Sequence, residues 1–169
     1  IIELVNKKFT WSVSSIRQGS LHLKIQSSAI QNQTDGLEIK INIYNRFLNN
    51  HISRNVFGMI ESRKKAKSTI MLTAHYDHLG RLGSETFFPG GNDNASGVAM
   101  MLSVAQRFKN KPLRNTNILV VAFAGEEIGL LGSKYLSEHP VTPLDKIKFQ
   151  LNMDIMGSGE KGITAVNGK

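Results

Sequence analysis

The chain has 169 residues, of which 40% are hydrophobic and 20% are charged, and its formal net charge is +8. These values are typical of a folded globular chain with a substantial core, so they exclude an intrinsically disordered protein. Cysteine is absent, which excludes disulfides and thiolate metal sites and leaves histidines and carboxylates as the available metal ligands.

The first part of the chain carries the patterns of short strands. Residues 1–20 show no clean period and begin an entry segment. Alternating apolar and polar residues then predict three half-buried strands, over 21–25, 37–47 and 56–60. A basic cluster follows, and we interpret it as a solvated hairpin turn before the next strand. The cluster consists of Arg63, Lys64, Lys65 and Lys67.

The second part of the chain alternates buried strands with helices. Two uncharged runs, 68–74 and 117–124, are typical of strands that are buried on both faces. Between them, a glycine-rich loop over 80–91 leads into a helix over 95–108, whose apolar residues recur at helical spacing. The remaining predicted elements are a short helix over 130–136 and strands over 149–155 and 162–166.

Strands and helices that alternate in this order predict an α/β fold. We expect a three-layer α/β/α arrangement around a mixed, largely parallel sheet, with antiparallel strands at one edge. The basic residues are scattered and few aromatics lie among them, so no nucleic-acid partner is expected. No apolar run reaches the roughly 18 residues that a transmembrane helix needs, so no transmembrane segment is expected either.

Side chains that bind metals follow the ends of three predicted buried strands. They are His75 and Asp77 after the first, Glu126 and Glu127 after the second and Asp154 in the third, with Asp93 in the loop before the helix. In open α/β sheets, ligands bind outside the carboxyl ends of the strands, so we expect these groups to converge. Asp77 lies on the same side of an extended chain as His75 and can accept the other ring N–H of that histidine.

Each of these groups has a structural explanation when it stands alone. His75 is then a hydrogen-bonded histidine at a strand end, Asp93 a helix cap, and the glutamate pair a partner for a helix N-terminus. Together they would crowd several carboxylates at one edge without a counter-charge, which costs stability. A pair of divalent cations removes that repulsion. Imidazole and oxygen ligands suit zinc, manganese or cobalt, and zinc is the best candidate for hydrolysis.

Four stretches of the sequence, in this order, match the motifs of a known family. They are TAHYDHLG (73–80), GGNDNASGVA (90–99), VAFAGEEIGLLGSKYL (121–136) and LNMDIMG (151–157). The chain thereby resembles the co-catalytic zinc exopeptidases that include aminopeptidase Y, bacterial leucyl aminopeptidase and glutamate carboxypeptidase. The resemblance covers roughly residues 55–168 and implies the zinc-exopeptidase form of the α/β fold.

The resemblance implies a role for each matched residue. One zinc would be bound by His75 and Asp154, and Asp93 would bridge to a second zinc. The second zinc would be bound by Glu127, while Glu126 would act as the general base and Asp77 would hold His75. The peptide bond between Asp93 and Asn94 is expected to be cis, as is common after the bridging aspartate in this family.

One family ligand has no counterpart in the sequence. The family's second zinc takes a further histidine near the end of the domain, and none of His22, His51, His78 and His139 lies in a motif that matches this ligand. We therefore expect residues 34–169 to be a zinc peptidase domain that is incomplete at its C-terminus. Residues 1–33 form the entry segment, which the resemblance relates to the tail of a preceding protease-associated domain.

The implied reaction is hydrolysis of an N-terminal peptide bond by a hydroxide that bridges two zinc ions, with Glu126 as general base. The substrates are peptides with a free N-terminus.

The alternatives are a carboxypeptidase or dipeptidase on the same site, a glutaminyl cyclase, and a non-catalytic binding module. Residues 94–97 and 128–133 resemble the peptidases rather than the cyclases, and the intact motif ligands argue against a binding module. The resemblance also implies a periplasmic or extracellular location, while the oligomeric state is left open.

Overall fold

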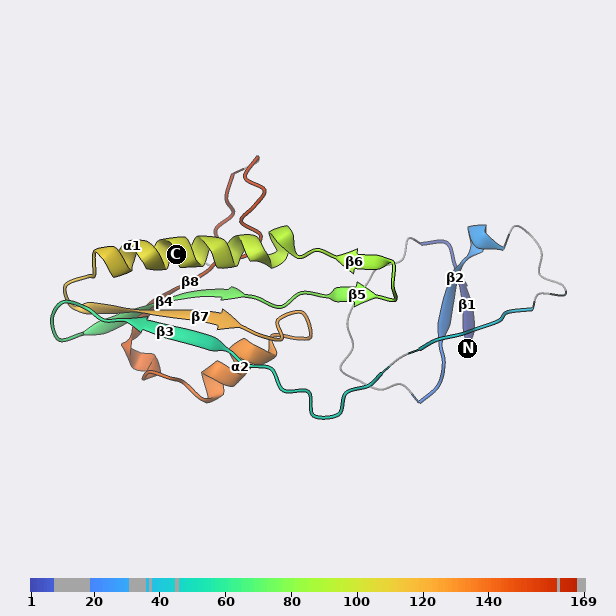
Figure 1. Ribbon diagram of the computed structural model, residues 1–169, viewed down its shortest axis with the longest axis horizontal. Helices are drawn as coiled ribbons and strands as arrows, with labels where there is room; N and C mark the ends of the chain where they lie inside the picture. The colour runs from blue at the N-terminus through green and yellow to red at the C-terminus, as the bar shows by residue number, and fades with distance from the viewer. Residues whose placement is uncertain (8–18, 31–35, 37, 45, 161, 167–169) are drawn as a thin grey trace. The chain divides into compact units, whose positions relative to one another are not determined.

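The computed structural model describes residues 1–7, 19–30, 36, 38–44, 46–160 and 162–166 (Figure 1). The chain divides into two compact units, Ile1–His51 and Ile52–Lys169. The domain boundary predicted after residue 33 lies outside the described residues, since 31–35 are not among them. Within the described residues, no helix is long and apolar enough to cross a membrane.

The first unit contains a two-stranded parallel sheet. Strand β1 (Ile2–Val5), which the sequence pattern did not predict, pairs with β2 (Leu23–Gln26), which confirms the strand expected near 21–25. A short 3-10 turn, Ser27–Ala29, follows β2. The strand predicted over 37–47 is wrong, because the described residues of that range belong to no strand. The isoleucines that alternate in this range are exposed, so they do not form the buried face of a sheet.

The second unit is built on a four-stranded mixed sheet with the order β3-β7-β4-β8. Its strands are β3 (Val56–Ile60), β4 (Ser68–His75), β7 (Thr116–Phe123) and β8 (Ile147–Asn152). The pairs β4–β7 and β4–β8 are parallel, whereas the edge strand β3 runs antiparallel to β7. The expected mixed, largely parallel sheet with an antiparallel edge is therefore confirmed.

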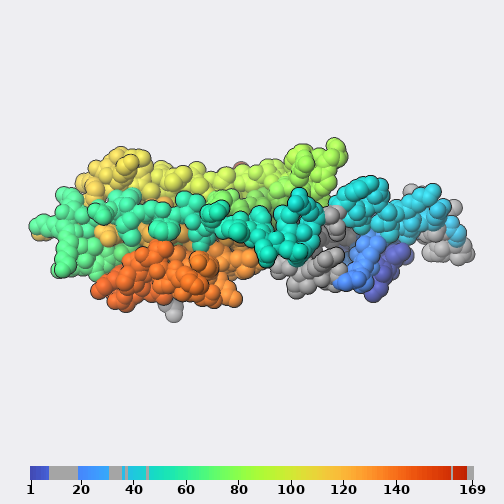
Figure 2. Space-filling view, turned by 60° about the horizontal axis from the view of Figure 1, so that its bottom comes forward, coloured from blue at the N-terminus to red at the C-terminus, as the bar shows by residue number. Residues whose placement is uncertain are grey.

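Helices cover both faces of this sheet (Figure 1). Helix α1 (Gly97–Asn110) packs Met101 against Leu72 and Ala74 of β4 on one face. Helix α2 (Leu131–Glu138) packs Leu136 with Met71 of β4 on the other face. Figure 2 shows the edge strand β3 between the layer of α1 and the layer that holds α2. Alternate residues of β4 and β7 thus serve two cores, which is why both runs lack charge.

The basic cluster after β3 is not a hairpin turn, contrary to the sequence interpretation. Strand β7 lies between β3 and β4, so the two strands flanking the cluster are not neighbours. The turn instead packs on the connection between α1 and β7, where the backbone N–H of Arg63 donates to Leu113 O and that of Lys64 to Arg114 O. Local turn chemistry cannot reveal that a strand from later in the chain enters between two earlier ones.

Two other loops complete the second unit. The glycine-rich loop contains a small antiparallel hairpin of β5 (Gly80–Leu82) and β6 (Thr86–Phe88). A 3-10 turn, Leu144–Lys146, precedes β8. The strand predicted over 162–166 does not form, since these residues pair with no strand.

A substitution at Met101 tests whether the packing of α1 stabilises the sheet. Met101 is 1% exposed, whereas its neighbour Leu102 is 56% exposed. Met101→Ala should lower the free energy of unfolding by about 2–5 kcal/mol, because it leaves a cavity between α1 and β4. The change should appear in urea denaturation followed by circular dichroism. Leu102→Ala is the matched control and should stay within about 0.5 kcal/mol of the parent chain; equal losses in both variants would contradict this packing.

Candidate metal centre

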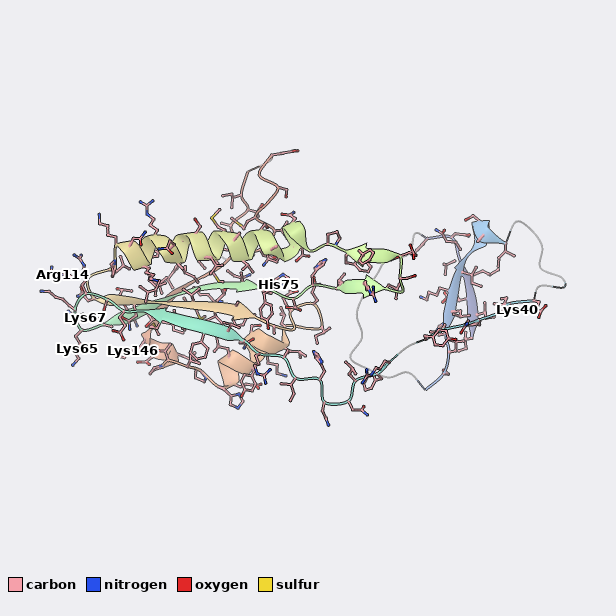
Figure 3. The ribbon with its side chains drawn as sticks, viewed as in Figure 1. Lys40, Lys65, Lys67, His75, Arg114 and Lys146 are labelled. Carbon is pink, nitrogen blue, oxygen red and sulfur yellow. The ribbon has the colours of Figure 1, made fainter. Side chains whose placement is uncertain are left out.

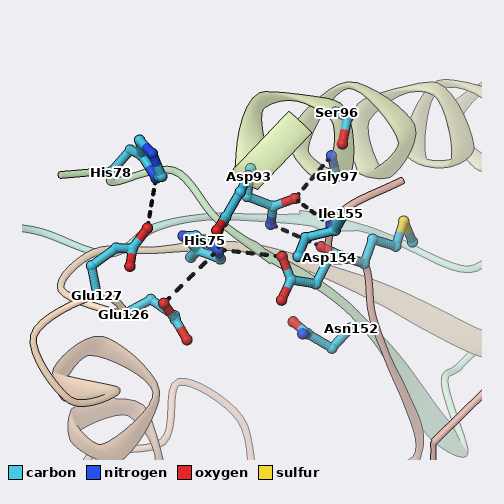
Figure 4. A network of polar contacts seen from close by, with 12 residues as sticks. His75, His78, Asp93, Ser96, Gly97, Glu126, Glu127, Asn152, Asp154 and Ile155 are labelled. Carbon is cyan, nitrogen blue, oxygen red and sulfur yellow. Dashed lines mark hydrogen bonds and ion pairs between the residues drawn. The ribbon is translucent and has the colours of Figure 1, made fainter. Parts of the chain in front are cut away.

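The parallel strands bring the predicted ligands to one edge of the sheet (Figure 4). Strand β4 ends at His75, which is paired with Phe123 at the end of β7, so the Glu126–Glu127 turn begins beside it. Strand β8 ends at Asn152, opposite Thr73, and Asp154 follows two residues later. These positions confirm the expected convergence of strand ends.

The ring of His75 is the centre of the cluster. Its Nε2 lies 3.1 Å from Asp93 Oδ1, 3.4 Å from Asp154 Oδ1 and 4.0 Å from Glu126 Oε2. Its Nδ1 donates a hydrogen bond of 3.0 Å to the backbone carbonyl of Asp77. A neutral ring in this tautomer presents the lone pair of Nε2 to two carboxylate oxygens. That arrangement is repulsive unless a proton or a cation lies between them.

Asp77 holds the site in a different way from the one predicted. Its carboxylate is 3.8 Å from His75 Nδ1, and the backbone carbonyl is the group that orients the ring. The carboxylate accepts the backbone N–H groups of Glu126 at 3.1 Å and Glu127 at 3.2 Å. Asp77 therefore joins the end of β4 to the turn after β7 and sets the direction of the glutamate pair. The spacing in the sequence predicted on which side of the chain Asp77 lies. It could not predict whether the carboxylate or the backbone carbonyl of Asp77 contacts His75.

His78 belongs to the site although the sequence motifs gave it no role. Its Nδ1 lies 2.6 Å from Glu127 Oε1, and both side chains are largely buried. His78, Asp93 and Glu127 each offer a ligand atom within 4.8 Å of the others. The available signal in the sequence was a second histidine in the same loop after β4.

Asn94 locks together the two loops that carry Asp93 and Asp154. Its buried amide donates to Met153 O at 3.0 Å, and its Oδ1 accepts the N–H groups of Gly97 at 3.1 Å and Ile155 at 3.2 Å. A Cβ at Gly97 would lie 2.2 Å from Asn94 Oδ1, so only glycine fits there. Asp93 and Asn94 lie in an irregular helical turn, Gly91–Ser96, and the bond between them is cis, as predicted.

The pKa values reflect the crowding of acids. Burial acts to lower the pKa of His75, but the hydrogen bond to the Asp77 carbonyl and three carboxylates outweigh burial and leave the pKa raised. The three carboxylates are those of Glu126, Asp154 and Asp93. The pKa of Glu126 is raised as well. Burial is the largest cause, His75 opposes it, and the neighbouring acids raise the pKa further.

The donor set fits divalent cations. Five carboxylates and two imidazoles meet here, and among the described residues no Lys or Arg nitrogen lies within 4.0 Å of those carboxylates. Figure 3 places Lys65, Lys67, Arg114 and Lys146 at the other end of the sheet from His75. The groups His75–Asp93–Asp154 and His78–Asp93–Glu127 share Asp93. Imidazole and carboxylate donors of this kind suit zinc and its neighbours in the periodic table.

A cavity of about 280 Å³ opens beside the cluster. His75, Glu126 and Asp154 line it, together with uncharged side chains from β7, the start of α2 and β8. The uncharged lining residues are Phe123, Leu130, Ser133, Gln150 and Asn152. The cavity therefore offers room for a small or extended substrate directly against the candidate metal ligands.

The fold and site together define an α/β domain with a carboxylate- and histidine-rich metal centre at the carboxyl edge of its parallel strands. The chain belongs to Peptidase family M28, whose family model matches residues 55–169. The match covers the whole sheet and every candidate ligand, and it agrees with the family resemblance of the four motifs.

The chain is also similar to individual proteins. The chain is 35% identical over 111 residues to aminopeptidase YwaD of Bacillus subtilis, covering 64% of this chain and 23% of that protein. It is 28% identical over 168 residues to a probable zinc metalloprotease of Pyrenophora teres, covering 94% of this chain and 32% of that protein. A crystal structure of a peptidase M28 precursor from Shewanella amazonensis is 29% identical, with a TM-score of 0.48 over 59% of this chain and 22% of that one. The chain thus spans about a quarter to a third of the length of these relatives.

Removal of the Asn94 side chain should lower both the stability of the chain and its uptake of zinc. Asn94→Ala removes the partner of a buried carbonyl, of a buried N–H and of a partly buried N–H, so we expect a loss of roughly 3 kcal/mol in stability. Zinc uptake should fall with it, because the loops of Asp93 and Asp154 lose their link. Asn110→Ala, which removes an exposed acceptor of Gln106, is the control. Unchanged stability and zinc uptake in Asn94→Ala would contradict this role.

Zinc binding should release protons from the cluster. A ligand must lose its proton to bind metal, and the raised pKa of His75 places that competition at higher pH than for an ordinary histidine. Affinity should therefore fall as the pH is lowered through the raised pKa of His75. Calorimetry in two buffers of different ionisation enthalpy measures the proton count, and His139→Ala is a control for an exposed histidine. Affinity that stays constant between about pH 5.5 and 8 would show that no such histidine is involved.

Proposed function

We propose that the protein is a zinc-dependent exopeptidase that removes residues from the amino terminus of peptides. The observation that carries this proposal is the set of acidic and imidazole ligands around His75, which borders a cavity and has no basic side chain among its described neighbours. The similarity to an aminopeptidase and to a probable zinc metalloprotease supports it.

The proposed site has two zinc positions that share the carboxylate of Asp93. His75, Asp93 and Asp154 would hold one ion, and Asp93 and Glu127 would contribute to the other. Zinc, when bound, supplies Lewis acidity, which polarises the peptide carbonyl and makes water acidic enough to lose a proton near neutral pH.

Glu126 is the group best suited to move protons in this site. It lines the cavity, and its backbone N–H is held by the carboxylate of Asp77. Its raised pKa brings the carboxyl group closer to neutral pH, where it can both accept and return a proton. Glu126 takes a proton from the attacking water as the C–O bond forms, and delivers it to the amine nitrogen as the C–N bond breaks.

The charge of the site favours an amino terminus over a carboxyl terminus. Five ionised carboxylates exceed the charge of two zinc ions by one, so the neighbourhood stays negative after both ions bind. A free α-ammonium group is attracted to such a site, whereas a terminal carboxylate needs an Arg or Lys partner. The excess of negative charge therefore supports an aminopeptidase rather than a carboxypeptidase within this proposal. A periplasmic or extracellular location is part of the proposal and rests on the family resemblance.

Replacement of Glu126 tests the proton transfer. Glu126→Gln keeps the size and the backbone contacts but removes the base, so the turnover of an aminoacyl anilide should fall by roughly 10²–10⁴-fold with zinc content unchanged. Glu138→Gln, a change at an exposed glutamate on α2, is the matched control. Near-normal turnover in Glu126→Gln would rule out the assigned role.

A panel of end-blocked peptides accompanies this measurement and distinguishes the alternative functions. An aminopeptidase should cleave a peptide with an amidated C-terminus and fail on its N-acetylated form. The reverse pattern would indicate a carboxypeptidase, release of pyroglutamate from an N-terminal glutamine a cyclase, and peptide binding without turnover a binding module.

A further inference from the structure

The contact between His78 and Glu127 has no part in the motif-based assignment of the site. His78 Nδ1 lies 2.6 Å from Glu127 Oε1, and the side chains are only 21% and 17% exposed. His78 comes from the loop after β4 and Glu127 from the turn after β7, as Figure 4 shows. A contact this short between partly buried side chains from two separate segments calls for a physical explanation.

The length of the contact identifies it as a hydrogen bond. Two ligand atoms that share a tetrahedral zinc at 2.0–2.1 Å lie about 3.3 Å apart. The distances of 3.1 Å and 3.4 Å from His75 Nε2 to Asp93 and Asp154 match that spacing. The His78–Glu127 distance of 2.6 Å is too short for two atoms on one ion, but it suits a charge-assisted hydrogen bond.

We propose that His78 is a positioning residue that aims Glu127 at the second zinc. An ionised carboxylate only accepts hydrogen bonds, so Nδ1 of His78 carries the proton and donates it to Oε1 of Glu127. This bond leaves Oε2 of Glu127 free as the ligand atom. The inference rests on the proposed function, and it assigns to His78 a role that differs from that of the zinc ligand His75.

The position of the pair relates it to one of the two metals. The group of His78, Asp93 and Glu127 is distinct from the group of His75, Asp93 and Asp154, and only Asp93 belongs to both. Loss of the His78 bond should therefore affect the second ion and spare the first. Hydrogen-bond partners of a metal ligand typically change metal affinity by 10–100-fold when they are removed.

Two neighbouring features fix the geometry of the contact between His78 and Glu127. The carboxylate of Asp77 accepts the backbone N–H of Glu127 at 3.2 Å, so consecutive residues hold the backbone and the side chain of the same glutamate. Gly90 lies under the imidazole with φ of 64°, and a Cβ there would come within 3.0 Å of His78 Cβ and Cγ. The glycine thus leaves room for the ring in the orientation that reaches Glu127.

Zinc titration against a competing fluorescent chelator tests the proposal on the whole chain. The parent chain should take up two zinc ions, and His78→Ala should weaken the second by roughly 10–100-fold while the first keeps its affinity. His78→Asn places an amide N–H where Nδ1 lies in histidine, so it should recover much of the second affinity. His139→Ala, at an exposed histidine on the same unit, is the matched control and should leave both affinities unchanged.

Several outcomes would overturn the proposal. One is a second affinity that does not change in His78→Ala; another is an asparagine variant as weak as the alanine variant although both remain folded by circular dichroism. A parent chain that binds one zinc with the first affinity and no second would also overturn it, while leaving the first site in place.

A metal-independent measurement separates this inference from the proposed function. In the metal-free chain, ¹⁵N spectra of the histidine side chains should show His78 as the Nδ1–H form, with a signal that shifts in Glu127→Gln. A neutral Nε2–H form would refute the hydrogen bond. A parent chain that binds no zinc at all would refute the proposed function, and the tautomer of His78 would still decide whether the bond exists.

Discussion

The parallel pairing of β7, β4 and β8 is the constraint on which the site depends. Parallel strands end at the same edge of a sheet, so the residues that follow β4, β7 and β8 meet although they are far apart in the chain. The pairing also explains the two apolar faces of these strands, since a crossover connection places a helix over each face. The architecture and the site therefore arise from the same arrangement of strands.

The electrostatics of the edge follow from that geometry. His75 lies where three segments meet, and carboxylates from each of them surround its ring. Hydrogen bonds hold these segments in place: Asp77 accepts the backbone N–H of Glu126, and Asn94 accepts those of Gly97 and Ile155. Neutral hydrogen bonds can place these acids but cannot neutralise them. Among the described residues no Lys or Arg side chain pairs with these acids, so their charge and geometry suit divalent cations.

The sequence predicted the elements that carry long, uncharged or strictly periodic patterns. The strands at β3, β4 and β7, both helices and the convergence of ligands at His75 are examples. It failed where a pattern needs a partner that only the fold supplies, as in the isolated alternation over 37–47 and the supposed hairpin at the basic cluster. No role was predicted for His78, because its contact partner Glu127 lies 49 residues further along the chain.

The separation of charge along the strands gives the second unit an electric dipole moment. Acidic groups gather at the carboxyl ends of the parallel strands, and Lys65, Lys67, Arg114 and Lys146 lie at the opposite end (Figure 3). The eight residues of β4 set these poles roughly 25 Å apart. Close to the edge, a field of this shape favours the orientation that turns the cationic end of a molecule toward His75, whereas the formal net charge of +8 gives cations no attraction from a distance.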